Sequence, residues 1–225
     1  MKVILVGNGS SILDYELGKY IDSEFDLVFR INRFKIKGFE KYVGSRVDGW
    51  FIADTGMQWL NPNDTVKFAK EAEGVLFQDN MKRITINAPK FKVTDSFLSE
   101  INDLKENYKN MYGADRITMI NPVTEDEIRS EVKTKFPPNA WPTTGLSAIK
   151  SLVNSFQNIY LHGFDGMSKK YKYYHYFDKE DNRTTEHAWT RKPEHNFEIE
   201  TEYINSLRKD GKLIDINERM FKRTI

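Results

Sequence analysis

The sequence predicts an α/β sandwich in which helices flank a mostly parallel central sheet. Apolar strands alternate with amphipathic helices along the chain, a pattern typical of parallel α/β folds. The first apolar run, Val3–Val6, stops at the turn Gly7-Asn8-Gly9, where a helix is expected to follow directly at Ser10-Ser11. With 225 residues and a hydrophobic content of 39%, the chain can bury one full core. We therefore expect a single domain over residues 1–225, without internal repeats.

The remaining elements follow from the spacing of apolar residues and from turn residues. Strands are expected at Leu27–Phe29, Val47–Ala53, Gly74–Phe77, Arg83–Ile86, Ile117–Ile120, Ile159–Leu161 and Leu213–Ile216. Helices are expected at Thr65–Glu73, Ser96–Asn110, Thr124–Lys133, Thr144–Asn154 and Phe197–Lys209. The stretch from Gly166 to Lys192 is polar, aromatic and aperiodic, which predicts a long functional loop.

The composition disfavours several classes of protein. Charged residues make up 30% of the chain but balance to a net charge of +1, so no global field attracts nucleic acid. The absence of cysteine excludes disulfides and thiolate catalysis and fits a reducing compartment. No apolar run is long enough to span a bilayer. We expect a cytoplasmic protein with no nucleic-acid partner and no membrane span.

The turn at Gly7–Ser11 is the first indication of a ligand. Its backbone N–H groups and the helix start expected after it would form a site for an anion. The strand Leu27–Phe29 then delivers Arg30 and Asn32 to the same edge of the sheet. Ligands of open α/β sheets bind outside the carboxyl ends of the strands. Together these segments predict a Rossmann-type nucleotide site.

The pattern departs from the dinucleotide-binding fingerprint, which disfavours an NAD- or FAD-dependent oxidoreductase. The third glycine of G-x-G-x-x-G would fall at Ile12. Asn32-Arg33 stands where an acidic residue is expected at the end of the second strand. A structural turn that binds no ligand is a further alternative.

The histidines lie in the last third of the chain, at His162, His175, His187 and His195. Their spacing forms no zinc site, and no Asp-x-Asp pair is present to hold a metal-bound diphosphate. His195 opens the helix Phe197–Lys209, with Glu198 and Glu200 close behind. The helix start and the carboxylates act in opposite directions on a charged imidazole, so His195 suits a general base. A surface or capping role is the alternative for this residue.

These segments resemble the sialylmotifs of glycosyltransferase family 29, the sialyltransferases. The long motif is similar to residues 6–46, and the small motif resembles Pro142–Leu146 followed by Ile159–Phe164. Ile120-Asn121-Pro122 is similar to a short family strand between them. The third motif resembles His175-Tyr176-Phe177-Asp178, where the family usually ends in Glu, and the fourth, His-x-x-x-x-Glu, resembles His195–Glu200. A weaker similarity extends to the bacterial sialyltransferases of family 42.

The resemblance implies a GT-A-like fold and an inverting transfer of sialic acid, or of a related 2-keto acid sugar, from a CMP-linked donor to a glycan acceptor. It implies that neither a metal nor another cofactor is required. His195 would be the catalytic base and His175 would support the leaving phosphate, with Arg30, Asp178 and Glu200 in supporting roles. The nucleotide-binding residues it implies are Gly7, Asn8, Gly9, Ser10, Asn32, Asn121, Thr143, Thr144, Gly145 and Gly163.

Animal members of the family have an N-terminal anchor and a disulfide between the long and small motifs, and this sequence shows neither. The resemblance therefore implies a compact member of prokaryotic or viral style, with a nucleotide-binding N-terminal half and a catalytic segment at 140–216. It would meet a membrane only through a lipid-linked acceptor. Loops that face the acceptor are expected at Asp54–Leu60 and Gly166–Lys192. The alternatives are a CMP-Kdo-dependent transferase and a nucleotide- or carbohydrate-binding protein without turnover.

Overall fold

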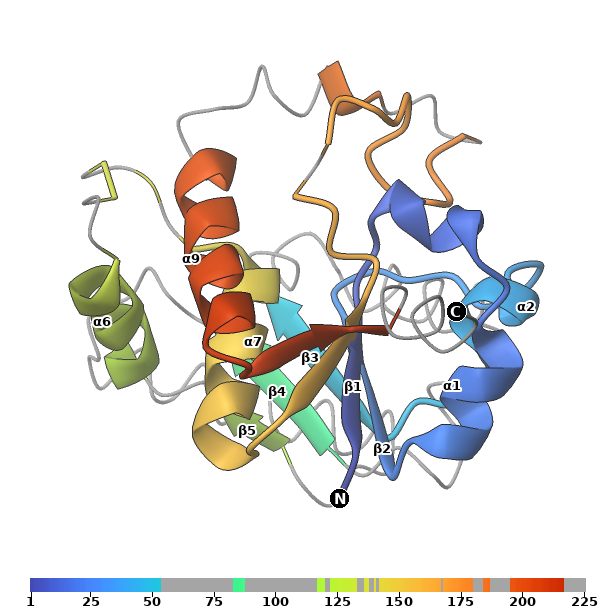
Figure 1. The fold of residues 1–225 in the computed structure, drawn as a ribbon, viewed down its shortest axis with the longest axis horizontal. Helices are drawn as coiled ribbons and strands as arrows, with labels where there is room; N and C mark the ends of the chain where they lie inside the picture. The colour runs from blue at the N-terminus through green and yellow to red at the C-terminus, as the bar shows by residue number, and fades with distance from the viewer. Residues whose placement is uncertain are drawn as a thin grey trace.

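A computed structural model describes residues 1–53, 83–87, 117–119, 122–132, 136–137, 140, 142–166, 168–179, 184–186 and 195–216. In this part of the chain, helices flank a seven-stranded sheet with the strand order β5-β4-β3-β2-β1-β6-β7 (Figure 1). Every neighbouring pair of these strands is parallel. The predicted fold class is confirmed. Among these residues, no helix is both long and apolar enough to cross a membrane.

The strands are β1 (Val3–Val6), β2 (Leu27–Ile31), β3 (Gly49–Ala53), β4 (Arg83–Asn87), β5 (Ile117–Met119), β6 (Ile159–His162) and β7 (Leu213–Asp215). The helices are the 3₁₀ helix η1 (Ser10–Asp14), α1 (Gly18–Glu24), α2 (Glu40–Val43), α6 (Pro122–Glu131), α7 (Thr144–Ser155) and α9 (Phe197–Lys209). The elements predicted in this part are confirmed, with small shifts at their ends. The elements predicted at Thr65–Glu73, Gly74–Phe77 and Ser96–Asn110 lie outside the described residues.

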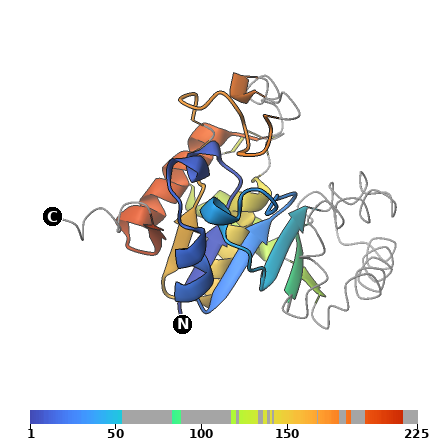
Figure 2. The same cartoon turned by 90° about the vertical axis from the view of Figure 1, so that its right-hand side faces the viewer.

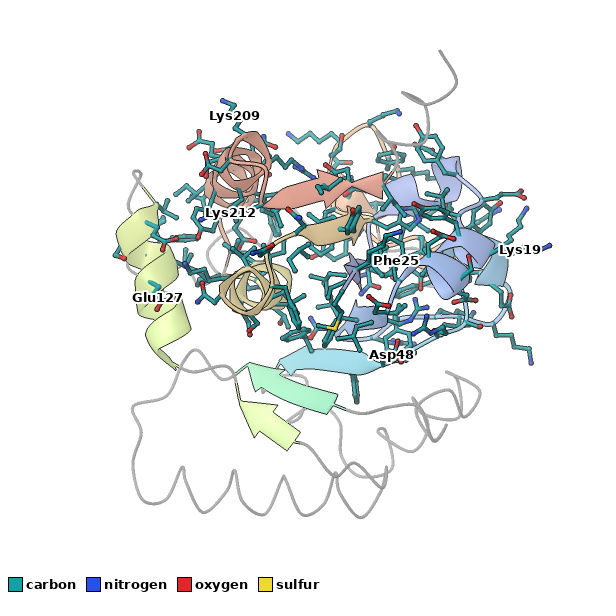
Figure 3. The ribbon with its side chains drawn as sticks, turned by 60° about the horizontal axis from the view of Figure 1, so that its bottom comes forward. Lys19, Phe25, Asp48, Glu127, Lys209 and Lys212 are labelled. Atoms are coloured by element: carbon teal, nitrogen blue, oxygen red, sulfur yellow. The ribbon has the colours of Figure 1, made fainter. Side chains whose placement is uncertain are left out.

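Strand β1 is buried on both faces because helices cover both sides of the sheet (Figures 2 and 3). Ile4 and Val6 pack in the core cluster that includes residues of α1 and α2. Val3 and Leu5 point to the opposite face, into the cluster formed with α7 and α9. Side chains alternate between the two faces of a strand, so a continuous apolar run is what a doubly covered parallel strand requires.

The order of the strands reverses beside β1. Val6, at the end of β1, pairs with Arg30 of β2 on one side and with His162 of β6 on the other. Such a reversal opens a crevice outside the carboxyl ends of the strands, where α/β sheets bind ligands. The N-terminal ends of α7 and α9 lie at the same edge of the sheet (Figure 1).

The segment after the glycine turn differs from the prediction of a helix start with a free anion site. The 3₁₀ helix η1 occupies this position, and α1 begins only at Gly18. The carboxylate of Asp165 accepts a hydrogen bond from the backbone N–H of Ser11 at 3.0 Å. A Cβ atom on Gly9 would lie 2.5 Å from the same carboxylate. The chain's own Asp165 therefore fills the position where the sequence predicted an external anion.

We predict that Gly163→Ala destabilises the fold through two separate effects. Gly163 has a φ of +75°, and a Cβ atom there would lie 2.5 Å from the side chain of Ile12. The loss in the free energy of unfolding should exceed the 1–2 kcal/mol that is roughly the cost of a left-handed alanine. Gly211→Ala is the matched control, because Gly211 has a φ of +72° and, its two chain neighbours aside, no atom of the described residues lies within 4 Å of the added Cβ atom. If urea denaturation gives the same loss in the free energy of unfolding for both variants, the contact with Ile12 adds no cost and the prediction is wrong.

Candidate active site

The turn Gly7-Asn8-Gly9 is joined to the last residue of β6 and to the residue that follows this strand. The N–H of Gly7 donates to the carbonyl of His162 at 2.8 Å, and the N–H of Gly9 donates to the carbonyl of Gly163 at 3.0 Å. A Cβ atom on Gly7 would lie 2.5 Å from the carbonyl oxygen of Gly163. The absence of a side chain at Gly7 thus serves the close approach of two backbone segments, at the point where the strand order reverses.

Asn8 ties this turn to the end of β2. Its Nδ2 donates to the carbonyls of Ile31 at 3.1 Å and Arg33 at 2.8 Å. These bonds brace the bend at Asn32, whose φ of +45° lies in the left-handed region. The other amide atom of Asn8, Oδ1, is buried and has no hydrogen-bond partner among the described residues. Because an unpaired buried acceptor is costly, Oδ1 is a position where a ligand donor is favoured.

The third motif lies on the same turn. His175 forms an antiparallel bridge with Gly9, and the N–H of Tyr176 donates to the carbonyl of Asn8 at 3.0 Å. The hydroxyl of Ser10 donates to the carbonyl of Tyr173 at 2.8 Å, so its hydrogen is used within the protein. Residues 168–179, in light orange, accordingly lie beyond the end of β1 and beside η1 (Figures 1 and 2).

Tyr176 also joins this motif to the loop that follows β2. Its hydroxyl accepts from the backbone N–H of Lys35 at 2.9 Å and donates to the carbonyl of the same residue. Its ring packs edge-on against Phe39 and Phe177. Burial raises the pKa of Tyr176 to about 12, so the phenol stays neutral at physiological pH. Tyr176 is therefore an anchor that holds three segments of the site together.

His175 and Asp178 form a close pair inside the third motif. Asp178 is fully buried, and its Oδ2 accepts from the backbone N–H of His175 at 3.0 Å. Nδ1 of His175 lies 2.8 Å from the same oxygen, but without the alignment of a hydrogen bond. The imidazole stacks on Phe177 with the ring centroids 5.1 Å apart. Since Nδ1 is buried, Nε2 is the ring nitrogen left to face a ligand.

Glu200 joins the N-terminus of α7 to α9. Thr143 is the N-cap of α7, and its hydroxyl oxygen accepts from the N–H of Leu146. The same hydroxyl donates to Oε2 of Glu200 at 2.6 Å, and the N–H of Thr143 donates to Oε1 at 2.8 Å. Burial raises the pKa of Glu200 to about 7, although both hydrogen bonds from Thr143 act to lower it. The hydroxyl of Thr143 therefore connects two helices, beside the buried Thr144 and the half-buried Gly145.

His195 lies immediately before α9 at this edge of the sheet. The N-cap of α9 is Asn196, whose side chain accepts from the N–H of Ile199 at 3.1 Å. His195 therefore does not cap or open the helix, and the capping alternative is wrong. Its half-buried ring lies 6.1 Å from that of Phe197, centroid to centroid. The bond from Glu200 to α7 fixes the first turn of α9, and with it the position of His195.

Arg30 belongs to the scaffold and does not line the crevice. Its guanidinium is fully buried; Nε donates to the carbonyl of Arg46 and Nη2 to those of Val43 and Gly44. Burial lowers the pKa of Arg30 to about 10, so it remains a cation. Arg30 was expected in a supporting role, and the structure places its side chain against the end of α2 and the loop that follows it.

Several predicted site residues lie outside the described part of the chain: Asn121, His187 and the loop Asp54–Leu60, with much of Gly166–Lys192. In the part that is described, no three His, Asp or Glu side chains gather in a way that could hold a metal ion. Sequence reasoning did not single out Asp165 as part of this site. Its place just beyond the carboxyl end of β6 is the signal that could have identified it.

Comparisons with known proteins agree with these motifs. The chain matches the model of Glycosyltransferase family 29 (sialyltransferase) over residues 2–212. The chain belongs to this family. The rat and human enzymes named CMP-N-acetylneuraminate-beta-1,4-galactoside alpha-2,3-sialyltransferase (Rattus norvegicus, Homo sapiens) are each 47% identical to it over 45 residues. That match covers 20% of this family 29 chain and only 12% of each relative.

Two solved structures show the same fold. A mammalian sialyltransferase superposes with a TM-score of 0.57 and 20% sequence identity. The match covers 96% of this chain and 68% of the chain of that structure. A mammalian sialyltransferase in complex with Gal-beta-1-3GalNAc-ortho-nitrophenol gives a TM-score of 0.55 and 19% identity over the same shares. The family 29 fold therefore extends across nearly the whole chain.

We predict that Glu200 makes the stability depend on pH. Its folded pKa of about 7 exceeds the ordinary value of 4.5, so the folded protein binds the proton more tightly than the unfolded chain. The stabilisation is complete below the ordinary pKa and is lost as the pH rises through the folded pKa. A pKa difference of this size corresponds to a change of about 3 kcal/mol in the free energy of unfolding between the two pH limits.

Glu200→Gln keeps an acceptor and a donor for Thr143 but cannot ionise, so it should flatten this part of the pH profile. The measurement is urea denaturation of both proteins across the interval between the two pKa values. Glu202→Gln, at an exposed position of the same helix, is the control and should leave the slope unchanged. If the free energy of unfolding of Glu200→Gln changes with pH as steeply as that of the wild type, another group causes the pH dependence.

Proposed function

We propose that this protein is an inverting glycosyltransferase that transfers sialic acid from a CMP-linked donor to a hydroxyl of a glycan acceptor. The observation that carries the proposal is the docking of His175–Asp178 on Gly7–Gly9 through the Gly9–His175 bridge. Two motifs distant in the sequence thereby meet at the reversal of strand order, where α/β sheets bind nucleotides. Membership of family 29 supports the donor class.

The hydrogen bonding of the turn indicates how it would hold the nucleotide. Oδ1 of Asn8 can only accept, so its partner would be a ribose hydroxyl or the cytosine amino group, not a phosphate oxygen. The N–H groups of Gly7 and Gly9 are already used by the segment after β6. Contact with the phosphate therefore falls to Nε2 of His175. The further contacts proposed are those of Ser10, Asn32, Asn121, Thr143, Thr144, Gly145 and Gly163.

The chemistry needs one base and one group that stabilises the leaving phosphate. His195 would take the proton of the acceptor hydroxyl while that oxygen attacks the anomeric carbon from the face opposite CMP. The bond to the phosphate oxygen breaks, CMP leaves with the electron pair, and the configuration inverts. His175 would donate a hydrogen bond to the phosphate as its charge grows. A monophosphate leaving group requires no bridging ion, so we propose that no metal or other cofactor takes part.

The acceptor class we propose is a galactoside. The curated relatives are named for transfer to β-1,4-galactosides, and a solved relative binds Gal-beta-1-3GalNAc-ortho-nitrophenol. The decisive assay mixes the protein with CMP-Neu5Ac or CMP-Kdo, with and without a galactoside, in EDTA and in magnesium. We expect galactoside-dependent release of CMP from CMP-Neu5Ac at similar rates in both buffers. Release of CMP from CMP-Kdo but not from CMP-Neu5Ac would show that Kdo, and not sialic acid, is the sugar transferred. Activity that is lost in EDTA and restored by manganese would show that a metal takes part.

Thermal unfolding separates an enzyme from a binding protein without turnover. We expect CMP, but not UDP or NAD, to raise the melting temperature, since a ligand at a hundred times its Kd stabilises by about 2.7 kcal/mol. Stabilisation by CMP without release of CMP from either donor would favour a binding protein. A larger shift with UDP would contradict the choice of nucleotide.

The roles of the two histidines can be told apart by kinetics. His195→Ala should lower kcat about a hundredfold or more and leave the affinity for CMP nearly unchanged, as for a positioned base. His175→Ala should lower kcat and also weaken CMP binding, because this ring faces the phosphate. Asn196→Ala is the control: it removes the helix cap, at a cost of about 1 kcal/mol, but keeps the imidazole. Full turnover in His195→Ala would show that another residue is the general base.

A further inference from the structure

The carboxylate of Asp178 has a structural task that uses only part of its hydrogen-bonding capacity. Its Oδ2 accepts from the backbone N–H of His175, and this bond closes the turn that presents the imidazole. Its other oxygen, Oδ1, is buried and has no hydrogen-bond partner in the part of the chain that the structure describes. An asparagine could accept the same backbone bond, so that bond does not explain why a carboxyl group rather than an amide is buried at this position.

The imidazole of His175 is unsatisfied on the side that faces this carboxylate. Nδ1 is buried, makes no hydrogen bond with any described residue, and lies 2.8 Å from Oδ2 of Asp178. The ring is held by stacking on Phe177, with an angle of 17° between the planes. A small turn of the ring would align Nδ1–H with the carboxylate, and such catalytic hydrogen bonds often become aligned only when the substrate binds.

We propose that Asp178 is a positioning residue for His175, whose carboxylate keeps the Nδ1–H on the protein side and so presents Nε2 to the leaving phosphate. A carboxylate only accepts hydrogen bonds, so the nitrogen that faces it must carry a hydrogen. A phosphate oxygen also only accepts, so Nε2 must carry a hydrogen when the donor is bound. With the donor bound, both ring nitrogens then donate, Nδ1 to the carboxylate and Nε2 to the phosphate, so the ring lies as an imidazolium between two anions.

Asp178→Asn separates the charge from the structural bond. Oδ2 both accepts from the backbone N–H of His175 and lies against Nδ1, so an amide oxygen in its place can accept from both groups. Only the negative charge is lost, and the ring would then meet the phosphate with a hydrogen on one nitrogen rather than on both. This inference rests on the proposed function only for its kinetic readout, because the protonation of the ring can be observed directly.

The direct test is ¹⁵N NMR of the histidine side chains in the full-length protein, with and without CMP. The chain has four histidines, and His175→Gln assigns the signals of His175 by their disappearance. We expect Nδ1 to be protonated in the wild type, both nitrogens to be protonated with CMP, and only one nitrogen to be protonated in Asp178→Asn with CMP. A wild-type ring without hydrogen on Nδ1, or the same protonation of the two proteins with CMP, would overturn the proposal.

The kinetic test compares Asp178→Asn in two backgrounds. With His175 present, kcat should fall about tenfold to a hundredfold, more than the KM for the donor changes, because the charge on the phosphate grows in the transition state. With His175→Ala already introduced, Asp178→Asn should cause no further loss. A second loss of equal size would show that Asp178 acts only through the structure of the loop, which would overturn the proposal.

Asp48→Asn is the matched control for burial of a carboxylate. Oδ2 of Asp48 also accepts from a backbone N–H, that of Val28 at 2.9 Å, and the side chain is buried. Asp48 directly precedes β3, at the end of the sheet opposite the site (Figure 3). Its replacement should lower the stability but leave the protonation of His175 and kcat unchanged. If the wild type releases no CMP from any donor, the proposed function fails, while the NMR spectra still decide the link between Asp178 and His175.

Discussion

The site depends on the close contact between the turn after β1 and the segment after β6. Two backbone hydrogen bonds join Gly7 and Gly9 to this segment, and a side chain on either glycine would collide with it. Asp165 then closes the turn by accepting from the N–H of Ser11. Because the strand order reverses at this point, the contact creates the platform on which residues 173–178 dock. Loss of this contact would separate the nucleotide-binding turn from the motif that carries His175.

The motifs that identify the family combine scaffold residues with chemical groups. Arg30 and Arg46 donate mainly to backbone carbonyls of neighbouring loops. Asp22 accepts from the N–H groups of Ser45 and Arg46 and fixes the loop after α2. A charged residue in such a motif is therefore not by itself evidence of contact with a ligand. The geometry of each side chain has to decide between a structural and a chemical role.

A buried carboxylate accompanies each of the two histidines for which we propose a chemical role. Asp178 lies beside Nδ1 of His175, and Glu200 accepts hydrogen bonds from Thr143 and fixes the first turn of the helix that follows His195. Burial makes such interactions strong because little solvent screens them. It also fixes their geometry, since each carboxylate accepts from a backbone N–H as well. The two imidazoles are thus supported by groups that lie inside the protein rather than in the crevice.

The sequence by itself determined the order and type of the strands and longer helices in the described chain, because apolar spacing and capping residues are local signals. It did not predict the 3₁₀ helix η1 or the short helix α2. Its motifs also indicated the family, which the family model confirms. Only the tertiary structure decided which atoms meet: Asp165 fills the turn, Arg30 faces the protein, and Asn196 rather than His195 caps α9. Ser11 and Asp165 are 154 residues apart in the chain. The position of one polar atom opposite another depends on the packing of distant segments, and no local pattern encodes it.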